Sequence, residues 1–199
     1  MKTKFLFEEL LTLVKSLAPE SIGKLKQGHS KSTIESTIEI KPIPNSLAVI
    51  YFCADGDDIS EFIPFYNLIP LNEINDKINI FRQVRNEIIN ADKSTKDGHE
   101  YLYWETDMIP FLDNHCGSKI LVRSLSEDES VWKMSKYDPT IKINSSIDKF
   151  LMSTIEFYRQ GAYYQELDDD DELDWTTDWD LAKNIVKQID PEIENYSPP

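Results

Sequence analysis

The apolar residues near the N-terminus recur three and four positions apart. Leu6, Leu10 and Leu13 follow this spacing, and the pattern ends before Pro19, which predicts an amphipathic helix over residues 4–18. Polar residues dominate positions 23–31, which predicts a loop after this helix.

Two apolar segments further along fit a helix and a strand about equally well. Between positions 33 and 40 the isoleucines alternate as on a strand, whereas Ser32 and Glu35 have the spacing of a helix-capping box. Positions 45–54 place apolar residues on one helical face and have Gly56 just past their end, but the run of Val, Ile, Tyr and Phe is also typical of a buried strand. The residue pattern leaves both alternatives open for each segment.

A longer helix and a β-rich half follow. A strand candidate at 65–70 leads to a helix that is capped at Asn72 and runs to Asn90, and a polar loop at 91–98 comes after it. Short apolar runs between polar turns predict strands at 101–104, 109–112, 119–125, 131–137 and 140–143.

Two further helices and the single-domain length complete the predicted fold. Ser145 and Asp148 have capping spacing, and a last helix begins near Thr177 and ends before Pro191. We therefore predict an α+β fold in one domain over residues 1–199. Its central sheet is mostly antiparallel with helices around it, and the segment 165–190 packs on it.

Charge narrows the class of partner. The chain has a net charge of −15, and residues 161–199 contribute 12 acids against 2 lysines. Such a surface repels a phosphate backbone, so we expect no direct nucleic-acid binding. It suits a basic protein partner, because complementary charge speeds encounter and selects partners.

The N-terminal residues and the cysteines favour a cytoplasmic protein. Glu8 and Glu9 interrupt the apolar stretch that a signal peptide needs, and no apolar run approaches the roughly 20 residues of a membrane helix. Cys53 and Cys116 lie among apolar residues, so we expect both to be small buried hydrophobes in a reducing compartment. We expect no membrane association.

The longest charge run is Asp168, Asp169, Asp170, Asp171 and Glu172. A calcium-binding loop that begins at Asp168 needs glycine at its sixth position and glutamate at its twelfth, where the chain has Leu173 and Trp179. A solvated acidic loop or a protein-docking patch explains the run better than a metal site.

His115, Cys116 and Gly117 raise the question of a zinc site or a nucleophile. His29 and His99 lie in polar segments with no cysteine nearby, and zinc sites need four ligands in spaced pairs. A catalytic cysteine–histidine pair meets across the fold instead of along the chain. The residue pattern therefore supports neither a zinc site nor a nucleophile here, and we expect no metal or cofactor.

A second acidic group comprises Asp55, Asp57 and Asp58 around a single glycine. Three acids repel phosphate, whereas Gly56 in the left-handed conformation would end a helix and leave Asp57 and Asp58 exposed. Tryptophans are most simply core residues, but one beside an acidic surface would anchor an interface. The predicted partner-binding residues are Asp55, Asp57, Asp58, Asp168, Asp169, Asp170, Asp171 and Trp175.

The order of several short motifs resembles the SUKH superfamily. This superfamily contains Smi/Knr-type regulators of fungal cell-wall assembly and many bacterial toxin-immunity proteins. The residues that carry the resemblance are Glu35, Pro44, Asp55-Gly56, Leu68-Ile69-Pro70-Leu71-Asn72-Glu73-Ile74, Trp104, Ile109-Pro110-Phe111, Ser146, Phe150, Leu151 and Gly161-Ala162-Tyr163. Gly117-Ser118 departs from the Gly-Asp pair that is usual in the superfamily.

The resemblance implies that the segments 33–40 and 45–54 are helices and that His115, Cys116 and Gly117 form a turn before the next strand. It also implies a non-enzymatic protein-interaction domain, foremost a cytoplasmic immunity protein that binds and neutralises a basic, nuclease-type toxin. The alternative from the same superfamily is a regulatory scaffold for cell-wall assembly or signalling. A hydrolase built on His115 or Cys116 is the alternative from another class.

Overall fold

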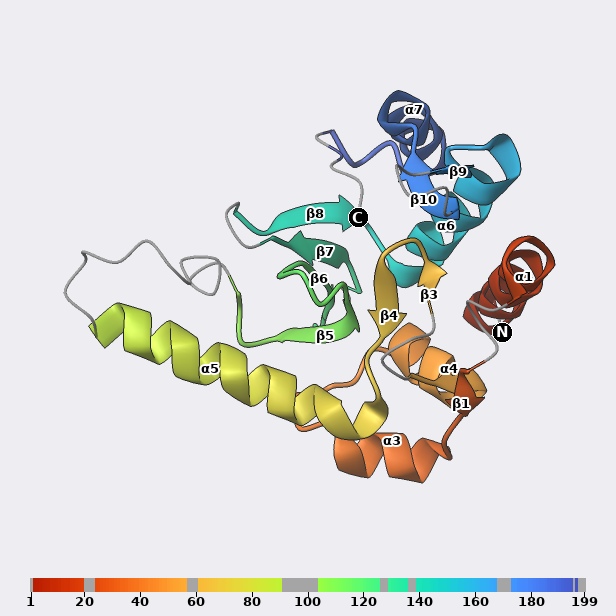
Figure 1. Cartoon of the computed structure of the whole chain (residues 1–199). Coiled ribbons are helices and arrows are strands. Elements are labelled where there is room, and N and C mark those ends of the chain that lie inside the picture. The colour runs from red at the N-terminus through yellow and green to blue at the C-terminus, as the bar shows by residue number, and fades with distance from the viewer. Residues whose placement is uncertain are drawn as a thin grey trace.

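The centre of the fold is a six-stranded antiparallel sheet in which each strand pairs with the strands before and after it along the chain. Its strands are β3 (Glu61–Ile63), β4 (Tyr66–Leu68), β5 (Met108–Asp113), β6 (Lys119–Arg123), β7 (Val131–Met134) and β8 (Ile141–Asn144). This computed structural model describes residues 2–19, 24–56, 61–90, 104–125, 129–135, 139–167, 173–194 and 196 (Figure 1). The predicted α+β class with a mostly antiparallel central sheet is confirmed.

Helices surround the sheet (Figure 1). They are α1 (Lys2–Leu17), α3 (Lys31–Thr37), α4 (Asn45–Cys53), α5 (Ile74–Asn90), α6 (Ile147–Gln160) and α7 (Trp179–Ile189), with a short 3₁₀ turn η1 (Leu71–Glu73) before α5. Each matches a predicted helix, and the two ambiguous segments are helical, as the resemblance implied. The loop predicted at 91–98 lies outside the described residues, as does most of the strand predicted at 101–104, and Trp104 itself is not in a strand.

The core is one apolar cluster that joins the helices to both faces of the sheet. All six residues of β5 are buried, so the sheet is covered on both sides. Phe111 of β5 meets Phe150 of α6 edge to face at 6.0 Å. Trp104 packs against Phe81 of α5 at 5.8 Å, and its indole N–H donates to the carbonyl of Met108 over 3.0 Å, so its one polar atom is satisfied in the core.

Two small sheets and the strand β3 were not predicted. The first small sheet joins β1 (Lys26–Gln27) to β2 (Ala54–Asp55), and the second is a ribbon of β9 (Tyr163–Leu167) and β10 (Leu173–Thr177). Both residues of β1 are exposed, so no apolar pattern marks that strand in the sequence. The five-acid run between β9 and β10 hides the alternation that the two strands share.

Several helix caps are displaced from their predicted positions. The cap of α3 is Ser30, whose side chain accepts from the backbone N–H of Thr33, and the cap of α6 is Ser146. Ser145 instead donates its backbone N–H and its hydroxyl to the buried carboxylate of Asp190, over 2.6 and 2.9 Å. This contact attaches the end of α7 to the start of α6. The last helix is capped by Asp178, one residue after the predicted Thr177.

Helix α4 receives its N-terminal cap from a distant residue. Its preceding residue, Pro44, has no side-chain donor or acceptor, and the carboxylate of Glu129 accepts the backbone N–H of Asn45 at 2.8 Å and the hydroxyl of Ser46. A carboxylate at this end of a helix also interacts favourably with the helix dipole.

Replacing Glu129 with alanine is expected to lower the free energy of unfolding by about 1–2 kcal/mol, because the first turn of α4 loses the carboxylate that caps it. Urea denaturation followed by tryptophan fluorescence measures the change. Glu87→Ala, which removes an exposed glutamate of α5, is the control and should change stability by less than about 0.5 kcal/mol. Equal effects from the two substitutions would contradict the capping role.

Candidate protein-binding surface

The longest acidic run of the sequence connects the two strands of the β9–β10 ribbon along the chain. The strands pair from Tyr163 with Thr177 to Leu167 with Leu173. The residues that connect them, 168–172, include Asp168, Asp169, Asp170 and Asp171 and lie outside the described residues. Leu167 and Leu173, the described residues on either side of this run, are paired with each other.

One side of the ribbon packs on helix α6. Tyr158 of α6 contacts Tyr163 and Trp175 edge to face, at ring-centre distances of 5.1 and 5.4 Å. Trp175 is half-buried by this packing. The predicted anchor is therefore already largely engaged within the chain, where it holds the ribbon against the body of the protein.

The other side of the ribbon faces solvent. Side chains alternate along a strand, so Tyr164, Glu166, Asp174 and Thr176 share this outer side. Tyr164 is 40% exposed, both acids are exposed, and Thr176 donates its hydroxyl to Glu166 at 2.9 Å. Leu167, at the end of β9, is 64% exposed. Apolar and acidic groups are thus presented together.

Trp179 is a second exposed aromatic residue, in the first turn of α7 two residues after β10. It is 49% exposed and lies between two exposed acids, Asp178 and Asp180. Trp175 was the predicted anchor, and neither Trp179 nor Tyr164 was among the predicted partner-binding residues. A strand period of two places Tyr163 and Tyr164 on opposite sides, but it does not distinguish Trp175 from Trp179, which are four residues apart.

Asp55 is not part of an exposed acidic surface, which corrects the prediction. It is 7% exposed, and one carboxylate oxygen accepts the backbone N–H groups of Gly56 and Leu71 at 2.9 and 2.8 Å. The other oxygen contacts the imidazole of His29 at 2.8 Å. Burial occurs because the segment from β4 to η1 folds over the end of α4. Asp57 and Asp58, predicted with Asp55, lie outside the described residues.

Gly56 is required for a reason other than the one predicted. It does not adopt the left-handed conformation, so the expected left-handed helix cap is wrong. Instead its backbone lies against that of β4 and the next residue, and a Cβ at this position would be 1.7 Å from the carbonyl oxygen of Leu68. The close approach of two backbones excludes any side chain here.

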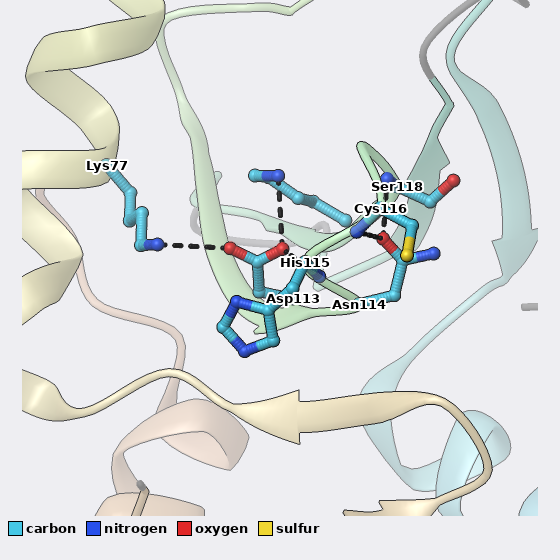
Figure 2. Close-up of polar contacts among 7 residues, drawn as sticks. Lys77, Asp113, Asn114, His115, Cys116 and Ser118 are labelled. Atoms are coloured by element: carbon cyan, nitrogen blue, oxygen red, sulfur yellow. Dashed lines mark hydrogen bonds and ion pairs between the residues drawn. The ribbon is translucent and has the colours of Figure 1, made fainter. Parts of the chain in front are cut away.

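The turn between β5 and β6 contains the His115-Cys116 pair (Figure 2). The side-chain oxygen of Asn114 accepts the backbone N–H groups of Cys116 and Ser118, at 3.0 and 2.8 Å. His115 has a φ of 55° and Gly117 a φ of 105°, values typical of a tight reversal. The predicted turn is confirmed.

The side chains of this turn do not form a nucleophile with its base. In Figure 2 the imidazole of His115 and the thiol of Cys116 lie on different sides of the turn. Cys116 is exposed, so the expectation that it is a small buried hydrophobe is wrong, whereas Cys53 is half-buried. A residue in a surface turn has too few neighbours to bury it.

Asp113 organises the base of the turn (Figure 2). Its carboxylate accepts from the ammonium groups of Lys77 and Lys119, both at 3.1 Å, and from the backbone N–H of His115 at 2.9 Å. Burial alone would raise the pKa of Asp113, but Lys119, the His115 N–H and Lys77 outweigh burial and hold the pKa below its usual range. This buried ion network joins α5 to the sheet.

Among the residues that the structure describes, no group of three or more His, Cys, Asp or Glu side chains could hold a metal ion. No helix in the described ranges has both the length and the apolar character to cross a bilayer.

Comparison with known proteins adds no relative. No model of a known protein family matches this chain, and no curated protein is significantly similar to it. The resemblance to the SUKH superfamily rests on the order of its sequence motifs.

Proposed function

We propose that this chain is a non-enzymatic protein-binding domain of the SUKH type, an immunity protein that neutralises a basic, nuclease-type toxin in the cytoplasm. The observation that carries the proposal is the pairing of Glu166 with Asp174, two exposed acids on the solvent-facing side of the β9–β10 ribbon. A nuclease binds phosphates through a basic surface, and an acidic ribbon complements that surface.

The ribbon and the first turn of α7 expose both kinds of group that such an inhibitor needs. The acids accelerate encounter with a basic partner, an effect that weakens as salt rises. The exposed side chains of Tyr164, Leu167 and Trp179 supply apolar area that salt does not screen, and aromatic residues are over-represented among those that dominate interface energies. Blockade is steric and electrostatic, and no residue of the chain performs a reaction.

The test is binding to basic, nuclease-type toxin domains, measured at low and high salt. Replacing Asp168, Asp169, Asp170 and Asp171 with asparagine should slow association about tenfold or more and flatten the salt dependence. Trp179→Ala should weaken the complex about 30-fold and leave the salt dependence unchanged, because it removes apolar contact only.

Two matched control variants distinguish the effect of the ribbon's residues from the effect of losing charge or apolar area elsewhere on the protein. The first replaces four exposed glutamates outside the ribbon with glutamine, namely Glu8, Glu35, Glu39 and Glu87. The second is Phe5→Ala, which removes an aromatic that is 66% exposed on α1. Both should bind as the unaltered chain does. A salt-independent complex, or equal losses from the two four-residue variants, would count against the acidic ribbon.

Other outcomes favour the alternatives. If the chain does not bind toxin domains but binds a cell-wall or signalling factor, the result supports the regulatory scaffold. A hydrolytic turnover that disappears in Cys116→Ala contradicts the non-enzymatic role.

A further inference from the structure

Helix α4 exposes an apolar side. It buries Leu47, Ile50 and Tyr51 in the core, as an amphipathic helix does. Its remaining residues beyond the first turn are also apolar, and they are half-buried or exposed: Ala48, Val49, Phe52 and Cys53. Phe52 is 54% exposed. A surface helix normally carries polar residues on its solvent-facing side. A helix that is apolar on both sides beyond its first turn therefore indicates a surface that is covered in the functional state.

The exposed side of α4 forms the wall of a shallow depression. Ile34, Ala48, Val49 and Phe52, named here the α4 face, line a hollow of about 310 Å³ together with Lys31 and Asn45. Helix α3 contributes Ile34 and Lys31 from one side of α4. From α1, the ammonium of Lys4 lies 5.8 Å from the centre of the Phe52 ring.

The charges around the α4 face cancel. Lys4 pairs with Glu8 on α1, and Lys31 pairs with Glu35 on α3, each at 3.6 Å. All four side chains are about half exposed or more, so they can exchange partners at little cost. The rim is therefore neutral and contains both signs of charge.

This neutrality is unusual for the chain. Residues 1–56 contain seven lysines and six acids, whereas the remaining residues contain 14 basic and 30 acidic side chains. A chain with a net charge of −15 repels copies of itself over most of its surface. The part that includes α1, α3 and α4 is where two copies approach without repulsion.

We propose that the α4 face binds the α4 face of a second copy and forms a two-fold symmetric dimer. A two-fold axis requires a self-complementary surface. The α4 face meets this requirement, because its apolar centre can pack on itself and each lysine of one rim can meet a glutamate of the other. In Figure 1 the β9–β10 ribbon lies beside α6 near α7, whereas α4 lies lower in the view beside α3, so dimer formation through α4 leaves the ribbon exposed. The dimer does not depend on the proposed function.

The dimer is expected to be weak. The α4 face is small beside the 1,200–2,000 Å² or so that stable interfaces bury, which places the dissociation constant at roughly 10–100 μM. Sedimentation velocity across this range should show a concentration-dependent rise from monomer to dimer. Phe52→Glu should raise the dissociation constant about 30-fold or more, because it places a charge at the apolar centre.

Ile89→Glu is the matched control, because Ile89 is 57% exposed on α5 and lies outside the α4 face. It adds the same charge and should leave the dimer unchanged. Far-UV circular dichroism of each variant checks that the helices are retained, as expected for an exposed position.

A mixing experiment tests the symmetry. Phe52→Glu and Phe52→Lys should each be monomeric alone, and an equimolar mixture should recover dimer, because the opposite charges face each other across the axis. A mixture that stays monomeric contradicts the two-fold arrangement. If the unaltered chain remains monomeric throughout the concentration range, the dimer proposal is wrong. If Phe52→Glu then also abolishes toxin binding, the α4 face is the toxin-binding surface instead.

Discussion

Replacing Gly56 with alanine is expected to cost at least about 3 kcal/mol of stability and to leave little folded protein, since overpacking against backbone is among the most damaging single changes. The new Cβ would lie 1.7 Å from the carbonyl oxygen of Leu68 and 2.9 Å from the carbonyl carbon of Ile69. Neither atom can move without displacing β4 from the central sheet. The yield of soluble protein and the midpoint of thermal unfolding measure the effect.

Gly161→Ala distinguishes this clash from the general effect of removing a glycine. Gly161 ends α6 with a φ of 76°, and a Cβ added there would meet no other described residue within 4 Å beyond its chain neighbours. Alanine at this position therefore meets only the strain of the left-handed conformation, about 1–2 kcal/mol. The Gly56 variant should be clearly the less stable of the two. Comparable stability of the two variants would show that β4 can shift enough to accommodate the added Cβ, which would contradict the prediction.

Replacing Asp113 with asparagine is expected to lower the free energy of unfolding by about 3 kcal/mol at neutral pH. The substitution preserves the shape of the side chain but removes the charge that Lys77 and Lys119 share. Lys119 is only 12% exposed, so water cannot replace its lost partner. Leaving one member of a buried ion network unpaired is the source of the cost.

The loss should depend on pH. The pKa of Asp113 is lower in the folded chain than in the unfolded one, where it is about 3.9, so its stabilisation is fully present above that value. As the pH falls through the folded pKa, the carboxylate becomes protonated and the stabilisation disappears. The stability curves of the two proteins should therefore converge below about pH 4.

Glu156→Gln is the comparison for the acid titration. Hydrogen bonds from Gln160 and Arg159 also lower the pKa of Glu156, but this carboxylate lies on the solvent-facing side of α6. Water screens such a pair, and its loss should cost less than about 0.5 kcal/mol at any pH. A pH-independent loss in Asp113→Asn would show that packing, and not charge, is what the asparagine disturbs.

Local periodicity in the sequence was enough to predict the longer helices. Helices α1, α5 and α6 each carry an apolar stripe over three turns or more, and a stripe of this length identifies a helix without knowledge of its neighbours. Short strands carry less information. β1 consists of two exposed residues and has no apolar pattern. β9 and β10 are separated by the acidic run 168–172, which was interpreted as a loop or docking patch and not as the connection of a hairpin.

Burial of single polar and aromatic residues was the least predictable property. Asp55 reads as a surface acid because acids follow it, yet its carboxylate accepts the N–H of Leu71, sixteen residues away. Trp175 and Trp179 are four residues apart, and which of them is exposed depends on where β10 ends and α7 begins. Glu129 caps α4 from 84 residues away, a contact that no local pattern indicates.

The fold class, the long helices and the concentration of acids toward the C-terminus follow from the residue order alone, because composition and periodicity are properties of the chain. The three-dimensional arrangement was needed to learn which acids reach solvent, which tryptophan is exposed, and that α4 presents an apolar side with a neutral rim. Those properties depend on contacts between segments far apart in the chain. Burial and electrostatic environment are set by such contacts, and the order of residues along a single segment does not contain them.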